Sequence, residues 1–251
     1  MTLDPIQSEA LTFLLSVERL YTALTAGAAT PGEPTLGGRL LYAGELDGRG
    51  RVLMVAGNVA GAASLGACAE AAIGKQAVRD GVADFLVNSL DEGLRILKNE
   101  IRKRETVAVC VAGEPAAVEA EMRERGVVAD LLAPEIDLDL PVGQVIVAWR
   151  VGDAPAQWLP RVDAMALEIV ERAGGADLGV ARRWLRLGPR YLGRMARGVR
   201  VLRGEAGVAE EFVGRVRAAV AGGEVGVEVE VGVDWGDSGR FGVSDPFAMK
   251  L

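Results

Sequence analysis

Three glycines within one short loop form the pattern in this sequence that most clearly suggests ligand chemistry. They lie in the run GELDGRG and are Gly44, Gly48 and Gly50. The loop separates the apolar run Leu40–Ala43 from the small-residue segment Arg51–Ala62, which predicts a strand followed by a helix. In this context, glycines allow backbone N–H groups at the helix N-terminus to bind the pyrophosphate of a dinucleotide.

Two acidic residues, Glu45 and Asp47, lie in the same loop and put negative charge where a phosphate would bind. Three interpretations of the loop follow. It is a turn that binds nothing, a dinucleotide site that tolerates the acids, or a site that has been adapted to another ligand.

Other groups capable of chemistry are few, because the chain contains no histidine. The run PEIDLDLP places Glu135, Asp137 and Asp139 two residues apart, so an extended chain presents all three carboxylates on one face. Such a face suits Mg²⁺ or Ca²⁺, or an acid held protonated, although a solvated loop is the simpler interpretation and we assign no metal ligand. The two cysteines, Cys68 and Cys110, lie in apolar runs, which predicts buried, reduced thiols.

Arginines are concentrated in one stretch, with Trp184 and Tyr191 between them. They are Arg182, Arg183, Arg186, Arg190, Arg194, Arg197, Arg200 and Arg203. The stretch suits an anionic small ligand or RNA, or it pairs with the chain's own carboxylates or with a second subunit. Because the formal net charge is −7, internal pairing is favoured and a nucleic-acid partner is not expected.

The elements that would position these groups alternate between strand and helix, which predicts a parallel, doubly wound α/β sheet. The expected strands are Leu40–Ala43, Ser64–Ala69, Asp84–Val87, Thr106–Val111 and Val127–Leu132. The expected helices between them are Arg51–Ala62, Ala71–Asp80, a capped helix that starts at Ser89, and Pro115–Gly126.

The rest of the chain is less regular, and its two ends, 1–35 and 181–251, are expected to form a smaller, mixed α+β part. The elements expected outside the alternating region are a helix Pro5–Thr25, a linker Ala26–Gly38, a strand Gln144–Val151, a helix Val162–Ala173, a helical stretch Val180–Arg203 interrupted at Gly188 and Pro189, a helix Val208–Ala221, and a strand near Val225–Asp234 with an acidic outer face.

The start of the chain lacks a secretory pattern, and the cysteines are not arranged as a disulfide framework, so we expect a cytoplasmic protein. The uncharged window Val52–Ala69 is rich in glycine and alanine, which favours a buried helix and strand over a membrane span. No membrane partner is expected.

The order of these motifs resembles urocanase, the NAD-dependent urocanate hydratase. GRLLYAG and GELDGRG are similar to the approach to the family's NAD loop and to its GGLGGMGG motif. The stretch LDEGLRILKNEIRKRETVAVCVAGEPAAV resembles the segment that ends in the family's GNAA, and RGVVADLL resembles its RGVxPDxVTDQTS segment. More faintly, GPRYLGRMARG resembles PxYIRPLFCRG, and GDSGRFGVS resembles GERARFGLA.

The resemblance implies a Rossmann-like NAD domain over residues 36–180, with an accessory domain from residues 1–35 and 181–251, and a homodimer by family analogy. The cofactor-binding positions it implies are Gly44, Glu45, Asp47, Gly48, Gly50, Gly113 and Glu114. At these positions Glu45 and Asp47 replace one glycine of each family pair, and Glu114 replaces the asparagine of GNAA. Cys68 aligns with the acidic residue that would bind ribose, and the catalytic cysteine falls near Ala196.

The sequence therefore predicts a degenerate urocanase-like protein without evident hydratase activity, which binds a cationic or neutral small molecule as a binding or regulatory module. We assign no catalytic residue and expect no cofactor, although the family resemblance leaves NAD open. The alternatives are a surviving hydratase or lyase that uses Glu45, Asp47 or Asp137 for proton transfer, and anion or nucleic-acid binding through the arginines.

Overall fold

The computed structural model describes residues 5–26, 35–132, 144–175, 178–193, 198–234 and 249–250. The chain divides into two units. Unit 1 contains Met1–Glu18, Asp137–Pro189 and Met195–Leu251, and unit 2 contains Arg19–Ile136 and Arg190–Arg194. The triple-acid run at 135–139 lies outside the described residues.

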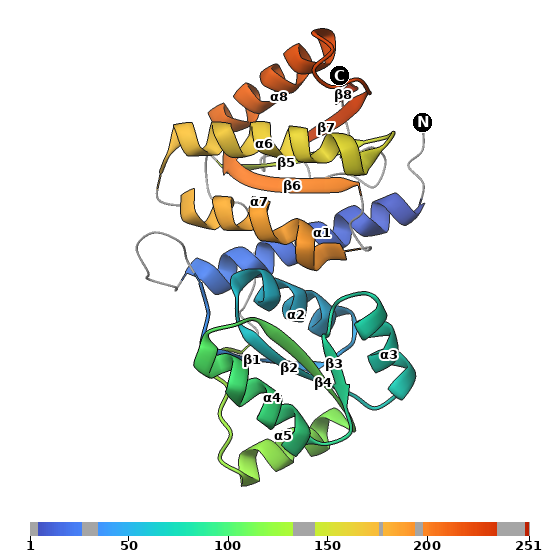
Figure 1. Ribbon diagram of the computed structural model, residues 1–251, viewed down its shortest axis with the longest axis vertical. Helices are drawn as coiled ribbons and strands as arrows, with labels where there is room; N and C mark the ends of the chain where they lie inside the picture. Colours follow the sequence, from blue (N-terminus) through green and yellow to red (C-terminus); the bar gives the residue numbers. More distant parts are fainter. Residues whose placement is uncertain are drawn as a thin grey trace. The chain divides into compact units, whose positions relative to one another are not determined.

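Unit 2 contains a four-stranded parallel sheet in the order β1-β2-β4-β3 (Figure 1). Its strands are β1 (Leu40–Glu45), β2 (Ala63–Cys68), β3 (Phe85–Val87) and β4 (Val107–Ala112). A helix follows each strand: α2 (Gly48–Ala60), α3 (Ala71–Arg79), α4 (Leu90–Lys103) and α5 (Pro115–Glu124). The predicted parallel α/β fold is confirmed.

The helices cover both faces of this sheet. A Cβ added to Gly57 of α2 would meet Leu41 and Ser64, and one added to Gly74 of α3 would meet Leu86 and Cys68, so both helices pack on the same face. The opposite face forms one core with α4 and α5. That core contains Leu40, Ala63, Leu65, Ala67, Val87, Leu90, Leu94, Leu97, Val107, Val109, Val111, Val118 and Met122. The sheet is therefore doubly wound.

The start of α4 follows the predicted capping pattern. The Ser89 hydroxyl accepts a hydrogen bond from the Glu92 N–H at 3.3 Å, while the Glu92 carboxylate accepts from the Asn88 N–H at 3.3 Å. Leu90, Leu94 and Leu97 of α4 face the core.

The expected strand Val127–Leu132 is mostly irregular, which corrects that prediction. Only Leu131 forms a bridge, with Leu41. The Leu131 N–H donates to the Leu40 carbonyl at 3.0 Å, and the Asp130 carboxylate accepts from the Leu40 N–H at 2.8 Å. A side chain thus takes the place of a strand partner, so the outer edge of β1 is covered without a fifth strand.

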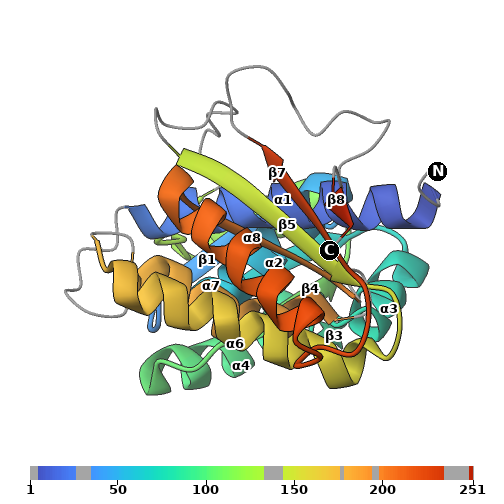
Figure 2. The ribbon, with the colours of Figure 1, turned by 90° about the horizontal axis from the view of Figure 1, so that it is seen from above.

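Unit 1 contains an antiparallel sheet in the order β6-β5-β7-β8. Its strands are β5 (Gln144–Val151), β6 (Val199–Glu205), β7 (Val229–Asp234) and β8 (Met249–Lys250). The helices α6 (Pro155–Ala173) and α8 (Ala206–Ala221) lie side by side and pack on β5 (Figure 2). The expected domain limits differ from these units, since 36–180 would have placed β5 and α6 with the parallel sheet.

Two further helices are α1 (Pro5–Ala26), close to its predicted limits, and α7 (Leu178–Leu192). The prediction of one interrupted helical stretch over Val180–Arg203 is wrong in two respects. Helix α7 continues through Gly188 and Pro189, and the chain from Val199 onward is strand β6. Val199 and Val201 are buried on alternate positions of β6, which is the period of a strand.

The strand β7 is not an edge strand, because it lies between β5 and β8. Glu230 of β7 stands opposite Arg150 of β5 in the register and forms an ion pair with it. An acid expected on a solvated outer face is therefore partly buried and neutralised by a cross-strand partner.

A partly buried carboxylate links α6 to the sheet of unit 1. The Trp149 indole N–H and the Arg200 Nε–H each donate to Asp163 at 3.0 Å. Trp149 and Arg200 stand opposite each other on β5 and β6, and the Trp149 ring also contacts Phe212 of α8 at 4.9 Å between centroids. Burial raises the pKa of Asp163, and the Arg200 charge and the Trp149 hydrogen bond act against that rise.

We predict that Arg200→Met lowers the free energy of unfolding of unit 1 by about 3 kcal/mol at pH 8, because it leaves the Asp163 carboxylate buried with no counter-charge. Without Arg200 the pKa of Asp163 rises further, so the folded state takes up a proton more readily than the unfolded state as the pH falls, and the loss is smaller at pH 5. Urea unfolding followed by tryptophan fluorescence measures this, since all four tryptophans lie in unit 1.

The matched control is Arg186→Met, which removes an exposed arginine of α7 and should change stability by less than about 0.5 kcal/mol. An Arg200→Met loss that is equal at the two pH values would contradict the assignment.

Candidate functional site

The glycine loop is shorter than the sequence suggested. β1 extends through Gly44 to Glu45, and α2 begins at Gly48, so only Leu46 and Asp47 separate the two elements. The Leu46 N–H donates to the Ala67 carbonyl at 2.8 Å, which continues the hydrogen bonding between β1 and β2 beyond the end of β1. The Leu46 side chain is buried and lies where a Cβ on Gly66 would be.

At two of the three loop positions, the backbone requires glycine for a reason that involves no ligand. Gly44 has a φ of +72°, in the left-handed region that favours glycine. A Cβ on Gly50 would lie 1.8 Å from the Glu45 carbonyl oxygen, so α2 can approach the end of β1 only if this residue is glycine. A Cβ on Gly48 would meet nothing within 4 Å.

The N-terminus of α2 is capped by the chain itself. The Asp47 carboxylate accepts a hydrogen bond from the Gly50 N–H at 2.8 Å. This is a first-turn donor of the kind that binds a pyrophosphate in a dinucleotide site. With Asp47 on that donor and Glu45 exposed beside it, the loop does not fit a pyrophosphate.

The winding of the sheet reverses between β2 and β4. The chain leaves β1 and β2 toward the face that holds α2 and α3, but it leaves β3 and β4 toward the face that holds α4 and α5. Ligands of open α/β sheets bind outside the carboxyl ends of the strands at such a reversal. A backbone hydrogen bond spans it, from the Gly113 N–H to the Cys68 carbonyl at 2.9 Å.

Two exposed glutamates stand at this reversal, each at the start of a helix. Glu70 is the N-cap of α3 and Glu114 is the N-cap of α5, and neither side chain makes a capping hydrogen bond. Because Cys68 pairs with Ala112 in the register, each glutamate lies two residues beyond that pair. Gly113, also an expected site residue, would tolerate a Cβ, which would meet only Val118 at 3.6 Å.

We name the carboxyl edge as the group formed by Glu45, Asp47, Glu70 and Glu114. The backbone hydrogen bonds described above join the ends of β1, β2 and β4, which bring these residues to neighbouring positions. All four are exposed, and within the described ranges none forms an ion pair with a lysine or arginine. The carboxyl edge is therefore a group of four acids that have no ion-pair partner among the described residues.

Sequence analysis missed Glu70, because it followed glycine spacing and family motifs. The available signal was positional: Glu70 comes immediately after a buried apolar strand and before a helix, as Glu114 does. No group of three or more acidic or cysteine side chains in the described part of the chain could hold a metal ion.

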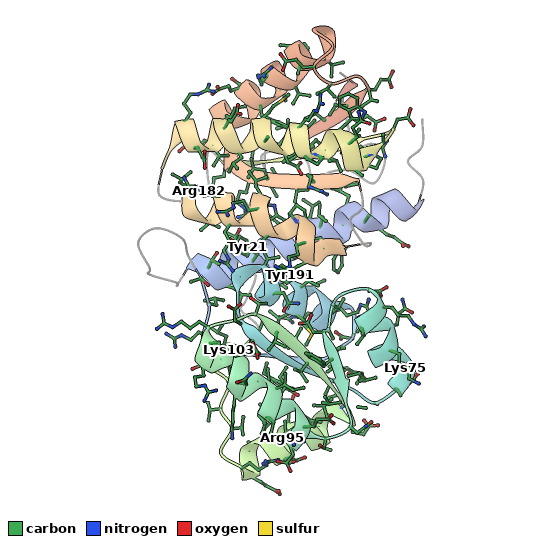
Figure 3. All side chains as sticks on the ribbon, in the orientation of Figure 1. Tyr21, Lys75, Arg95, Lys103, Arg182 and Tyr191 are labelled. Carbon is green, nitrogen blue, oxygen red and sulfur yellow. The ribbon has the colours of Figure 1, made fainter. Side chains whose placement is uncertain are left out.

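Three arginines of the arginine-rich stretch, Arg182, Arg200 and Arg203, pair with the chain's own carboxylates. Arg182 lies 3.0 Å from Glu171, and the Arg203 guanidinium makes two hydrogen bonds to Glu18, at 3.1 and 3.0 Å. Arg200 binds Asp163 as described. Arg190 instead stacks over the Tyr191 ring, 5.4 Å from its centroid. Arg194 and Arg197 lie outside the described residues. Figure 3 labels Arg182 and Tyr191 among the side chains.

Comparison with known families adds nothing to this site. No family model matches the sequence. The urocanase resemblance therefore rests on the sequence motifs alone. Among the residues that the structure places, no helix has the length and apolar character needed to cross a membrane.

We predict that Gly50→Ala lowers the free energy of unfolding of unit 2 by about 3 kcal/mol, because its Cβ would displace the Glu45 carbonyl. The matched control is Gly48→Ala, which should change it by less than about 0.5 kcal/mol. Hydrogen exchange of the β1 and β2 amides measures the stability of unit 2. Equal effects of the two substitutions would contradict the close approach at Gly50.

We also predict that Asp47→Ala lowers the stability of α2 by about 1 kcal/mol, because the Gly50 N–H loses its acceptor. Asp47→Asn keeps an acceptor oxygen, so it should lower the stability of α2 by less than half as much as Asp47→Ala. Hydrogen exchange at the Gly50 amide reports both variants, and protection unchanged in Asp47→Ala would show that Asp47 is not the cap.

Proposed function

We propose that this protein is a binding or regulatory module that takes a small cationic molecule at the carboxyl edge, and that it is not a urocanate hydratase with NAD in that place. The observation that carries the proposal is the set of four exposed carboxylates around the ends of neighbouring parallel strands, none of which forms an ion pair within the described residues. Such a position is where a fold of this kind usually binds its ligand.

The charge of the carboxyl edge supports a cation. A protonated amine, a guanidinium or a protonated imidazole forms charge-assisted hydrogen bonds with carboxylates, which are stronger than neutral ones. Glu70 and Glu114 have no capping bond to give up when they bind such a group. Repulsion by the same carboxylates disfavours phosphate-bearing ligands.

The geometry of the loop supports the exclusion of NAD. A pyrophosphate at the start of α2 would have to displace the Asp47 carboxylate from the Gly50 N–H and would lie near Glu45. Urocanase has glycines at these two positions, so the resemblance implies that this chain keeps the scaffold and has changed the ligand. Glu114 in place of the asparagine of GNAA adds a third negative charge.

The arginine stretch gives less support to an anionic partner. Arg182, Arg200 and Arg203 each face a carboxylate of the chain, so three of the eight arginines are already neutralised internally. A nucleic acid would have to compete with these ion pairs and with the net negative charge of the whole protein.

The test compares spermidine, agmatine and histamine with NAD by isothermal titration calorimetry. We predict that at least one of the three amines binds and that NAD does not. The triple variant Glu45→Gln, Glu70→Gln, Glu114→Gln should weaken amine binding at least about tenfold, since it removes three of the four charges that attract the ligand.

The matched control is Glu124→Gln, which removes an exposed carboxylate at the other end of α5. It should leave amine binding unchanged. Equal affinity in wild type and triple variant, or binding of NAD with none of the amines, would overturn the proposed function.

A further inference from the structure

The two cysteines of the chain lie together beneath α3. Cys68 is the last residue of β2 and Cys110 lies within β4, and their Sγ atoms are 3.3 Å apart. Both thiols are buried and reduced, and no other cysteine is present in the sequence. Burial raises the pKa of Cys110, so its thiol stays protonated in the closed fold.

Helix α3 is the cover over this pair, and few contacts hold it. A Cβ on Gly74 would lie 2.8 Å from the Cys68 Sγ, so the α3 backbone passes directly over that thiol. Gly74 and Ala77 are the buried residues of α3, whereas the others are exposed or nearly so. Figure 3 shows Lys75 on the outer side of the helix. A helix with so little buried apolar surface opens locally at a lower free energy than the whole unit.

We propose that Cys68 and Cys110 are a modification site, at which a peroxide forms a reversible intrachain disulfide when α3 opens, and that this disulfide rearranges the carboxyl edge. That the rearranged edge is a ligand site rests on the proposed function above. The disulfide itself does not depend on it.

The chemistry balances with hydrogen peroxide as the oxidant. The Cys68 thiolate, formed when opening exposes it to water, attacks one peroxide oxygen; the O–O bond breaks, giving a sulfenic acid and hydroxide. The Cys110 thiol then attacks the Cys68 sulfur; the S–S bond forms, the S–O bond breaks and water leaves. The proton that Cys68 released on ionisation converts the hydroxide to water. The two thiols therefore lose two electrons in total, and the peroxide is reduced to two molecules of water.

The register explains why the disulfide would disturb the carboxyl edge. Cys110 stands opposite Gly66, whereas Cys68 stands opposite Ala112, so the cysteines are diagonal neighbours. Diagonal Cα atoms are about 7–8 Å apart, which exceeds the usual separation of about 5.5–6 Å across a disulfide. Closing the bond therefore pulls on the end of β2, which carries the Cys68 carbonyl that binds Gly113 and leads directly to Glu70.

The first experiment exposes the full chain to hydrogen peroxide and measures its intact mass. We expect the loss of two hydrogen atoms from the monomer, no thiol reactive to iodoacetamide after denaturation, and restoration of both thiols by dithiothreitol. Cys68→Ser and Cys110→Ser should each prevent the loss. Two thiols that remain reactive after denaturation, a dimer linked between chains, or irreversible oxygen addition would overturn the proposal.

The second experiment tests the role of α3. Ala77→Gly lowers the helix propensity of α3 and removes one of its few buried groups, so it should raise the oxidation rate at least about fivefold, the factor expected from glycine's helix propensity alone. The same substitution at a buried alanine of α8, Ala219→Gly, is the matched control and should leave the rate unchanged. Equal rates in the two variants would overturn the assignment of α3 as the cover.

The third experiment tests the effect on the carboxyl edge without any ligand. Hydrogen exchange should be faster in the oxidised than in the reduced protein over residues 66–72 and at the Gly113 amide, because the hydrogen bond to Cys68 is strained or lost. Exchange over α8 serves as the internal control. Identical exchange at Gly113 in the two forms would overturn the rearrangement, while failure of amine binding alone would overturn only the proposed function.

Discussion

The direction in which each crossover leaves the parallel sheet is the constraint on which the rest of unit 2 depends. Right-handed crossovers are the rule between parallel strands, so the order β1-β2-β4-β3 sends α2 and α3 to one face and α4 and α5 to the other. Only between β2 and β4 do neighbouring strands send the chain to opposite faces. The carboxyl edge is the consequence of that reversal, and so is the buried dithiol, because Cys68 and Cys110 lie on these same two strands.

Electrostatics at the helix N-termini decides what this edge can hold. The positive end of each helix dipole stabilises a nearby carboxylate, which accounts for acids at the N-caps of α2, α3 and α5. The Asp47 carboxylate also accepts a hydrogen bond from the Gly50 N–H, as a helix cap. Glu70 and Glu114 do not make such bonds, so their charge remains available to a ligand. Asp47 therefore stabilises its own helix, whereas Glu70 and Glu114 are the acids that we propose for ligand binding.

Much of the fold was predictable from periodicity and turn chemistry, as β5 and the capped helix α4 show. The strand expected at Val127–Leu132 failed because the Asp130 side chain replaces a backbone partner, and β6 was taken for helix because its alternating valines are separated by arginines that suggested a helical face. In the candidate site, Gly44 and Gly50 were singled out from the sequence as ligand-binding positions. The structure instead explains both glycines by the tight turn between β1 and α2. Glu70 could be recognised as a site residue only from the order of the strands. The pairing of Cys68 with Cys110 could be recognised only from the register between β2 and β4, which depends on two segments far apart in the sequence.

The proposed function requires that the carboxyl edge binds a cation and excludes a dinucleotide. Native mass spectrometry of the purified protein tests this requirement by comparing the released small molecules before and after denaturation. We predict that no NAD is released, either as purified or after incubation with excess NAD, and that the protein retains mass from an added amine. NAD released in stoichiometric amounts would contradict it, since the Asp47 cap and the Glu45 charge would then be compatible with a bound pyrophosphate.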